Sequence, residues 1–431
     1  MASTYLTRAM NGNSTTTGTI SLWVKRANLG QNVICSFWED SSTYQRLQFD
    51  SQDRLNWKIF DNGTLYGQIT STAKFRDTNG WYHIVSRVDT TQSTSTDRVR
   101  LYVNGDLITS LDDTNYPTQN RNVKQSAVPY IGTEGTISSA RFDGCMSHIN
   151  YTDAASNAPT VFGETDASTG QWKINTSPSV TYGAKGFFIL KDGNSGTDQS
   201  GNSNNFTVSG TLTNTEDCPS NVFCTYNKLG TNRTMSTGNT VVTTTNADFY
   251  GAAGTIGASS GKYYWEVKLT TSTYSFVGVD YNPGESFRNN TSSNTAHSYL
   301  IYAGSGSIYN NSAITSYGSA YSQGDIVGVA MDLDNSKLYF RKNGDAWFNS
   351  GDPTSGSTGT GAFGLTAGET YFPVVGDGAS GYGAVTSTNF GNGYFGTTAI
   401  SSEGTNASNN GKFEYDVPTG YTALSTKGLN E

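Results

Sequence analysis

Paired carboxylates are the side chains of this sequence that could most directly take part in catalysis, because two acids facing one cleft can hydrolyse a glycosidic bond. Such acids stand about 5–5.5 Å apart in retaining enzymes and about 6.5–9.5 Å apart in inverting ones. Two pairs come near the required pattern, Glu39-Asp40 and Asp332-Leu333-Asp334. Neighbouring residues of a strand point to opposite faces, which separates the first pair. The second pair alternates correctly, and we interpret it as surface carboxylates on a strand.

Three histidines are the other groups that could take part in catalysis. His83 lies in the apolar, aromatic segment Trp81-Tyr82-His83-Ile84-Val85 and is interpreted as structural. His148 and His297 each stand alone in the sequence. A nucleophilic triad also needs a nucleophile and an orienting carboxylate, and no Gly-x-Ser-x-Gly segment offers the nucleophile. The sequence therefore predicts no catalytic residues.

Tyrosines concentrate in a stretch rich in glycine, serine and asparagine. Aromatic rings beside amide groups suit sugar rings, but tyrosine is also frequent in protein interfaces. A third interpretation, turns whose tyrosines cover the edge of a sandwich, stays open. Trp347 stays open between core and surface, as does Trp38. The predicted ligand-binding residues are Tyr302, Tyr309, Asn310, Tyr317, Tyr321 and Trp347.

Composition favours an all-β protein and excludes several partners. Charged residues make up 14% of the chain, against about 25% in an average soluble protein. Aromatic residues suit strands, and the abundant small polar residues suit turns. A net charge of −8 opposes binding to nucleic acid. No stretch approaches the roughly 20 apolar residues of a membrane span, and no export signal is recognised at the N-terminus. We therefore expect synthesis in a cytosol without membrane insertion.

A pattern that occurs twice indicates how the strands are arranged. Leu101-Tyr102-Val103-Asn104-Gly105 recurs, slightly altered, as Leu338-Tyr339-Phe340-Arg341-Lys342-Asn343-Gly344. Asn-Gly tolerates the positive φ angles of a two-residue type I′ turn, so each copy predicts a hairpin. We therefore predict two β-sandwich (jelly-roll) domains joined by a turn-rich connector.

The first domain is predicted over residues 1–152, where short alternating segments are spaced as in a sandwich. Its ordered segments resemble those of laminin-G-like, concanavalin A-like jelly rolls: Trp23-Val24-Lys25, Trp81-Tyr82-His83-Ile84-Val85, Leu101-Tyr102-Val103-Asn104-Gly105, Ile131-Gly132 and Phe142-Asp143-Gly144. Relatives of this kind often bind calcium through loop Asp and Asn oxygens. Calcium takes six to eight oxygens, so solvated loop side chains are the alternative here. The predicted calcium ligands are Asp106, Asp112, Asp113 and Asn115.

Three further segments complete the predicted organisation. Residues 153–235 are turn-rich but keep apolar anchors, which predicts a connector packed on one or both sandwiches. Residues 236–398 resemble the SPRY (B30.2) β-sandwich through Tyr263-Tyr264-Trp265-Glu266, Gly324-Asp325-Ile326-Val327-Gly328-Val329 and Asn389-Phe390-Gly391. Residues 399–431 are predicted to form an extended C-terminal tail, which packs back or leads to a partner.

The whole order of segments resembles virion appendage proteins of tailed bacteriophages. The resemblance includes the start, Met1-Ala2-Ser3-Thr4-Tyr5-Leu6, the segment Asp198-Gln199-Ser200-Gly201-Asn202, and the end, Tyr415-Asp416-Val417-Pro418-Thr419-Gly420-Tyr421. It implies a non-enzymatic tail fibre or fibre-tip subunit in the virion that recognises a host-surface receptor such as a polysaccharide. Other virion proteins and further copies of the chain, in a trimer, are the expected partners.

Three alternatives remain at this stage. The chain could be a capsid-decorating or adaptor protein that binds only other virion proteins. It could be a depolymerase of capsular polysaccharide, against which the missing carboxylate pair argues. A cellular lectin is disfavoured by the absence of a recognised export signal.

Overall fold

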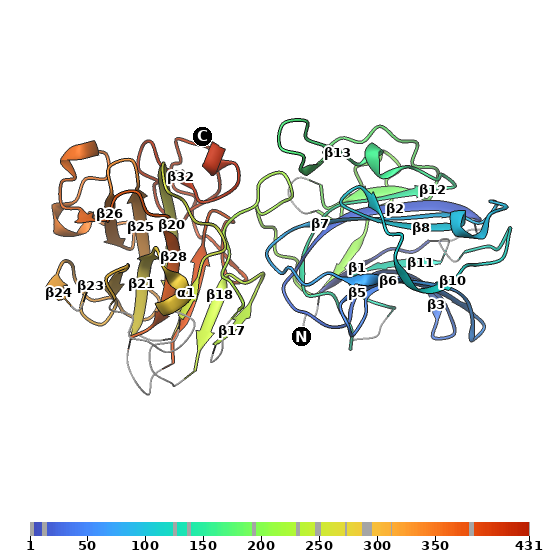
Figure 1. The fold of residues 1–431 in the computed structure, drawn as a ribbon, viewed down its shortest axis with the longest axis horizontal. Helices are drawn as coiled ribbons and strands as arrows, with labels where there is room; N and C mark the ends of the chain where they lie inside the picture. The colour runs from blue at the N-terminus through green and yellow to red at the C-terminus, as the bar shows by residue number, and fades with distance from the viewer. Residues whose placement is uncertain are drawn as a thin grey trace. The chain divides into compact units, whose positions relative to one another are not determined.

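The computed structural model describes residues 4–10, 15–123, 127–135, 139–191, 195–229, 233–245, 251–271, 274–286, 295–311, 313–378 and 383–430, with the side chains of 285 and 286 excepted. Antiparallel strands dominate, so the predicted all-β fold is confirmed. The chain divides into two compact units, unit 1 from Met1 to Asn214 and unit 2 from Thr215 to Glu431 (Figure 1). In the described part of the chain, no helix is long and apolar enough to cross a membrane.

Unit 1 contains two large sheets and a small hairpin. The eight-stranded sheet has the order β10 (Leu111–Asn115), β6 (Thr64–Lys74), β5 (Arg54–Asp61), β4 (Thr43–Phe49), β3 (Asn32–Asp40), β11 (Val128–Ile131), β1 (Tyr5–Thr7), β16 (Thr207–Ser209). The six-stranded sheet has the order β15 (Phe187–Ile189), β12 (Gly144–Asp153), β2 (Thr17–Arg26), β7 (Tyr82–Asp89), β8 (Val99–Val103), β9 (Asp106–Leu107). The hairpin pairs β13 (Gly163–Thr165) with β14 (Trp172–Ile174), and two short 3-10 helices are η1 (Ser95–Asp97) and η2 (Pro159–Val161).

Strand β5 shows how the sequence builds the core of unit 1. Side chains alternate between the two faces of a strand, and Leu55, Trp57 and Ile59 are fully buried between the sheets. Lys58 and Phe60 carry the opposite parity and are only half-buried. The same alternation therefore forms the core and a partly open outer face.

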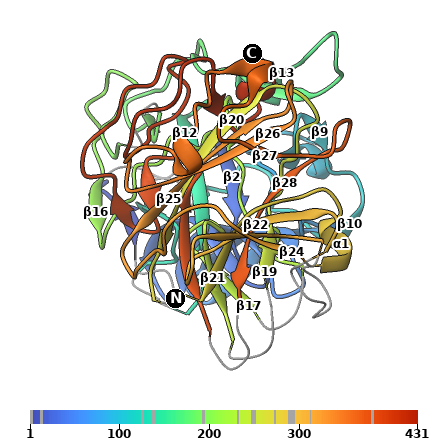
Figure 2. The ribbon, with the colours of Figure 1, turned by 90° about the vertical axis from the view of Figure 1, so that its left-hand side faces the viewer.

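Unit 2 repeats this plan with different connections (Figures 1 and 2). Its eight-stranded sheet contains β17 (Arg233–Ser236), β18 (Val241–Thr244), β29 (Val385–Asn389), β20 (Lys262–Leu269), β25 (Ile326–Asp332), β26 (Lys337–Lys342) and β27 (Phe363–Gly364) in that order, with β32 (Thr422–Ala423) parallel to β20. Its six-stranded sheet has the order β19 (Gly251–Ala253), β28 (Phe372–Asp377), β21 (Ser275–Asp280), β22 (Ser298–Tyr302), β23 (Ser307–Asn310), β24 (Ala313–Ser316). The remaining elements are β30 (Tyr394–Phe395), β31 (Thr398–Ala399), α1 (Pro283–Ser286), η3 (Phe348–Ser350), η4 (Gly356–Thr358) and η5 (Gly428–Asn430).

The two Asn-Gly copies have the same local structure but only one closes a hairpin. Asn104 and Asn343 both have positive φ, and each side chain accepts a hydrogen bond from the start of the neighbouring strand, from His83 N–H and Ile326 N–H respectively. Asn104-Gly105 joins β8 to β9 as predicted. The second predicted hairpin is wrong, because after Gly344 the chain leaves the sheet and returns to β26 only at β27. The excursion between them forms a wall of the pocket described below.

The segments predicted as connector and tail are built into the two units. The division between the units, after Asn214, falls inside the predicted connector 153–235. Within unit 1, β15 extends one sheet and β16 the other, and Phe206 packs edge-on against Phe187 with ring centroids 4.7 Å apart. Within unit 2, the predicted tail 399–431 adds β32 to the eight-stranded sheet. It also buries the side chains of Phe413, Val417, Tyr421 and Leu424.

Candidate functional site

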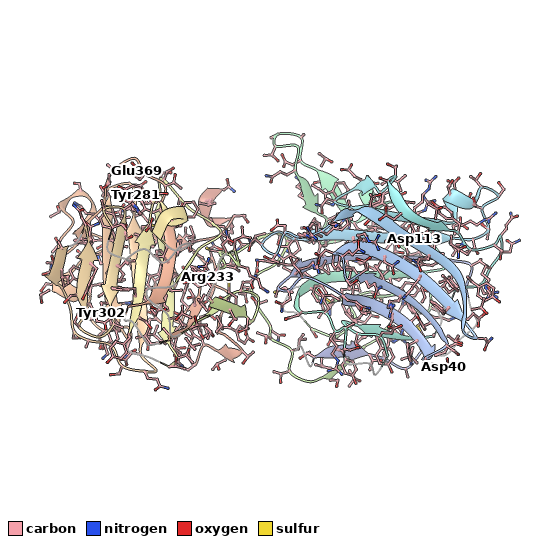
Figure 3. The ribbon with its side chains drawn as sticks, turned by 60° about the horizontal axis from the view of Figure 1, so that its bottom comes forward. Asp40, Asp113, Arg233, Tyr281, Tyr302 and Glu369 are labelled. Carbon is pink, nitrogen blue, oxygen red and sulfur yellow. The ribbon has the colours of Figure 1, made fainter. Side chains whose placement is uncertain are left out.

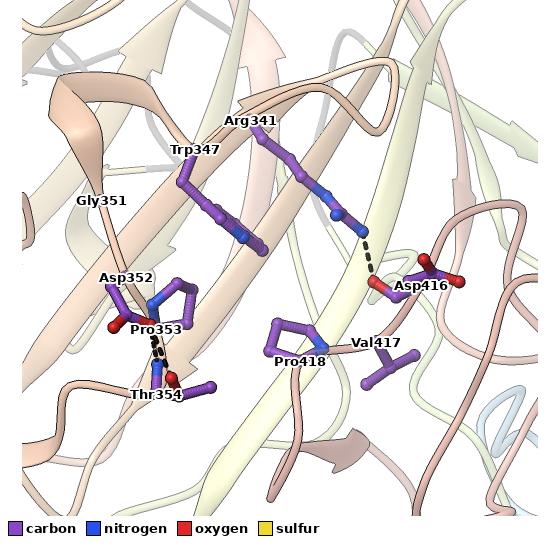
Figure 4. Close-up of a pocket in the computed structure, with 9 residues that line it drawn as sticks. All are labelled: Arg341, Trp347, Gly351, Asp352, Pro353, Thr354, Asp416, Val417 and Pro418. Atoms are coloured by element: carbon purple, nitrogen blue, oxygen red, sulfur yellow. Dashed lines mark hydrogen bonds between the residues drawn. The ribbon is translucent and has the colours of Figure 1, made fainter.

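A pocket of about 310 Å³ lies on unit 2, between the segment after β26 and the C-terminal segment (Figure 4). This volume is at the lower end of small-molecule sites, enough for one compact group. Trp347 is the one predicted ligand-binding residue that lines it. The full lining is Arg341, Trp347, Gly351, Asp352, Pro353, Thr354, Asp416, Val417 and Pro418.

Arg341 and Trp347 form the polar and aromatic wall of the pocket. The guanidinium carbon of Arg341 lies 4.7 Å from the Trp347 ring centroid, which is within the range of a cation–π contact. The same guanidinium donates to the Tyr264 hydroxyl at 2.8 Å and to the Asp416 carbonyl at 2.5 Å. These bonds fix the arginine, so the pocket has a preformed cationic and apolar surface.

Buried Glu266 on β20 holds the opposite wall in place. Its carboxylate accepts hydrogen bonds from the backbone N–H groups of Glu414 and Tyr415, both at 2.9 Å, and from the Tyr264 hydroxyl at 3.0 Å. Burial raises the pKa of Glu266 to about 7, although the two backbone hydrogen bonds act in the opposite direction. Glu266 therefore positions residues 414–418 without itself lining the pocket.

Two carboxylates line the pocket, but neither is placed to act as a general acid. Hydrogen bonds from the Thr354 hydroxyl and N–H lower the pKa of Asp352, and those from Thr405 lower the pKa of Asp416. Figure 4 shows the two residues on opposite sides of the pocket, with the Asp352 carboxylate turned toward Thr354. A glycosidase needs one carboxyl that is protonated near neutral pH. The arrangement suits binding rather than bond cleavage.

The other predicted ligand-binding residues are not brought to this pocket. Tyr321 is buried and donates its hydroxyl to the Arg341 carbonyl, and Tyr317 donates to the Gly361 carbonyl. Tyr302 and Tyr309 pack together on the six-stranded sheet, with ring centroids 5.7 Å apart (Figure 3 labels Tyr302). Asn310 donates its side-chain amide to the Ser298 carbonyl. The sequence set is therefore spread over three places in unit 2.

The four predicted calcium ligands lie on two different sheets of unit 1. Asp106 is on β9, at the edge of the six-stranded sheet, whereas the other three are on β10 of the eight-stranded sheet. The Asp112 carboxylate pairs with Arg54 at 2.6 Å, and Asp113 accepts a hydrogen bond from the Gln68 amide at 2.8 Å (Figure 3 labels Asp113). Asn115 is exposed. Among the described residues, no group of three or more His, Cys, Asp or Glu side chains could hold a metal ion, and calcium binding stays a prediction.

The carboxylates and histidines considered for catalysis have structural partners. Asp332 is buried and pairs with Lys262 at 3.0 Å, while Asp334 accepts from the Gly261 N–H at 2.7 Å. His297, which stands alone in the sequence, lies 3.1 Å from Asp280 through Nδ1. The Ser298 hydroxyl donates to the same Asp280 carboxylate at 2.7 Å. Asp332 is thus a buried ion-pair partner, which corrects its interpretation as a surface carboxylate.

Sequence reasoning missed most of the pocket. Arg341 lies within the repeated strand pattern, which predicts a hairpin and not a site. Asp352 and Pro353 lie in a segment without a motif, and residues 416–418 are far away in the sequence. One signal for Arg341 was its position in the middle of an aromatic strand, where an arginine needs a buried partner.

Family comparisons identify the two sandwiches. Residues 2–162 match the model of the concanavalin A-like lectin/glucanases superfamily, and residues 262–392 match the model of the SPRY domain. The chain therefore carries a concanavalin A-like domain and a SPRY domain. Both kinds of domain typically bind other molecules, so a binding or adhesion role fits the chain. No curated protein matches the sequence.

Three solved structures also resemble parts of this chain. The SPRY domain of human HERC1 is 22% identical, with 35% of this chain and 87% of that chain covered and a TM-score of 0.28. Stonustoxin is 21% identical, with 40% and 27% covered and a TM-score of 0.30. The PSpry domain of TRIM65 is 14% identical, with 38% and 91% covered and a TM-score of 0.30.

Proposed function

We propose that this chain is a non-enzymatic adhesion protein of a tailed-phage virion, a tail fibre or fibre-tip subunit that binds a host-surface polysaccharide. The observation that carries the proposal is the Trp347 pocket. It combines an indole ring, a fixed guanidinium and two ionised carboxylates. Such a set can hold a sugar unit through its apolar face and hydroxyl groups, and it lacks a protonated acid for cleavage.

The virion part of the proposal is supported by the ordered resemblance of the sequence to phage appendage proteins. Two binding-type domains in one chain suit a particle protein that holds a receptor with one domain and its own particle with the other. The proposal includes self-association into a trimer and attachment to other virion proteins. The virion is the proposed location.

Binding of the purified full chain to host cells tests the adhesion proposal. We expect saturable binding that extracted surface polysaccharide abolishes by competition. Trp347→Ala should weaken binding by about tenfold, whereas Tyr309→Phe, a change outside the pocket that keeps the ring packed against Tyr302, should bind like the wild type. Absence of cell binding by the wild-type chain would refute adhesion. Antibody labelling of phage particles tests the location, and an unlabelled appendage would refute the virion part.

A capsid-decorating or adaptor role is a second candidate, favoured by the edge of the six-stranded sheet in unit 2. Residues 298–324 contain no charged side chain, and strand β24 within them is exposed along its length, with Ile314 61% exposed. Uncharged exposed edge strands pair readily with other chains. A particle reconstruction that shows β24 buried against another virion protein, with the Trp347 pocket also covered, would favour this role over adhesion.

A further inference from the structure

A row of apolar side chains crosses the outer face of the eight-stranded sheet in unit 1. The register aligns one residue from each of five neighbouring strands on this face. Leu65 is exposed and the other four are half-buried, and Gly135 lies against the Trp38 indole near one end of the row. We call this row the aromatic strip; its residues are Val128, Trp38, Tyr44, Phe60 and Leu65.

The centre of the aromatic strip is a continuous stack of rings. Trp38 and Tyr44 have centroids 5.5 Å apart and an interplanar angle of 22°, and Tyr44 and Phe60 are 5.1 Å apart at 23°. Strands in a sheet lie about 4.8 Å apart, so five strands give a strip about 19 Å long. A long, narrow apolar strip suits an extended chain better than a compact ligand.

Two cations lie in the next row of the same face. Arg46 and Lys58 are cross-strand partners, and Arg46 is already paired with the carboxylate of Glu134. The Lys58 ammonium lies 5.7 Å from the Phe60 centroid and makes no ion pair with any residue of the described ranges. Gln68 follows Lys58 in the row on β6. Lys58 is therefore a cation beside the strip that no carboxylate of the described residues pairs with.

The surroundings of Lys58 disfavour its charged form. Burial and the neighbouring Arg46 lower the pKa of Lys58 to about 8. A half-buried ammonium near another cation is stabilised by any anion that reaches it. A ligand carboxylate would supply that anion without disturbing the Arg46–Glu134 pair.

We propose that the aromatic strip and Lys58 form a binding site for an acidic polysaccharide, such as one built from uronic acids. This inference rests on the proposed adhesion function and names its ligand class and a second site, on unit 1. The sugar chain runs along the strip with its C–H groups against the rings, and a carboxylate binds Lys58. The occupant is an anionic glycan rather than a neutral one because the free charge beside the strip is positive, although the whole chain carries −8.

Titration of the full-length chain with alginate, a uronic-acid polymer, and with neutral dextran tests the site. We expect binding of alginate only. Lys58→Met should weaken it about tenfold or more, since it removes a charged hydrogen-bond donor to the ligand carboxylate. Phe60→Thr should weaken it by a similar factor. Lys74→Met, which removes an exposed lysine from β6 of the same sheet, is the matched control and should bind like the wild type.

The pH dependence gives a second readout that loss of folding cannot imitate. Alginate affinity of the wild type should fall as the pH rises through about 8, and that of Lys58→Met should stay flat. Equal alginate binding by wild type, Lys58→Met and Phe60→Thr would overturn the inference, as would equal binding of dextran, or capture of a virion protein in place of the glycan. If the wild-type chain binds host cells but does not bind alginate, this inference alone is overturned and the adhesion proposal stands.

Discussion

Unit 1 contains two aromatic stacks of similar composition, one closed and one open. In the closed stack, His83 lies between Trp23 and Trp172, with centroid distances of 4.8 and 5.8 Å and interplanar angles of 19° and 16°. In the open stack, Tyr44 lies between Trp38 and Phe60 at comparable distances. The closed stack is covered by the β13–β14 hairpin, which carries Trp172.

The two stacks differ in their polar partners. The Trp172 indole N–H donates to His83 Nδ1 at 3.0 Å, which places the ring proton on Nε2, where it faces the Ser21 hydroxyl at 2.8 Å. Both ring nitrogens are therefore satisfied and burial lowers the pKa of His83 to about 3. Lys58, beside the open stack, has a cation-π contact but no carboxylate in the described chain. The closed stack has a completed set of partners, whereas the open stack has a charge beside it with no carboxylate partner among the described residues, and this difference supports the proposal that the open stack binds a ligand.

The largest expected effect is acid destabilisation of unit 1 through His83. The unfolded chain binds a proton at about pH 6.5, whereas the folded histidine does so only near pH 3. Stability is therefore complete above pH 6.5 and falls as the pH drops toward 3, by up to about 5 kcal/mol. Urea unfolding should show that the free energy of unfolding of the wild type falls relative to that of His83→Gln as the pH drops from 6.5 toward 3. A pH-independent difference would contradict the closed-stack account.

Removing the indole that covers the closed stack should lower the free energy of unfolding of unit 1 nearly as much as acid does. Trp172→Ala deletes a half-buried indole and exposes His83, so unit 1 should lose about 3 kcal/mol. The pKa of His83 should rise toward 6.5 in the same variant. Denaturant unfolding measures the first effect and an NMR titration the second. Unchanged stability would show that the hairpin is not part of the first sandwich.

Unit 2 should respond to pH with the opposite sign. Glu266 has a folded pKa raised to about 7, whereas the unfolded carboxyl titrates near 4.5. The folded state thus holds the extra proton in between, and stability falls as the pH rises from about 4.5 to 7, by up to about 3 kcal/mol. The free energy of unfolding of the wild type should fall relative to that of Glu266→Gln as the pH rises from about 4.5 to 7. A rise over the same range would refute the raised pKa of Glu266.

The smallest expected effect on stability lies in the open stack. Phe60→Thr replaces a half-buried ring with a residue that favours strands, so it removes little more than a cross-strand pair worth about 0.2–1 kcal/mol. Calorimetry should show a shift well below that of Trp172→Ala. A loss of similar size would mean that the open stack is a structural feature too.

Alternation and turn chemistry were enough to predict two sandwiches. Apolar residues at alternate positions, such as Leu55, Trp57 and Ile59, indicate which face of each strand is buried. The sites could not be predicted in the same way, because they depend on which residues of different strands and segments come together. Tyr302 and Tyr321 are close in sequence, yet one packs on an outer face and the other in the core. Trp38, Tyr44 and Phe60 meet only through the register of three strands. The pocket depends on residues 416–418, held by Glu266 from more than a hundred residues away.

We propose that this protein binds surface polysaccharide without cleaving it, and a count of sugar reducing ends distinguishes binding from hydrolysis. The purified chain is incubated with host-surface polysaccharide, and both retained polymer and new reducing ends are followed over time. We predict retention of the polymer with no increase in reducing ends. A steady increase that disappears in Asp352→Asn or Asp416→Asn would contradict the account.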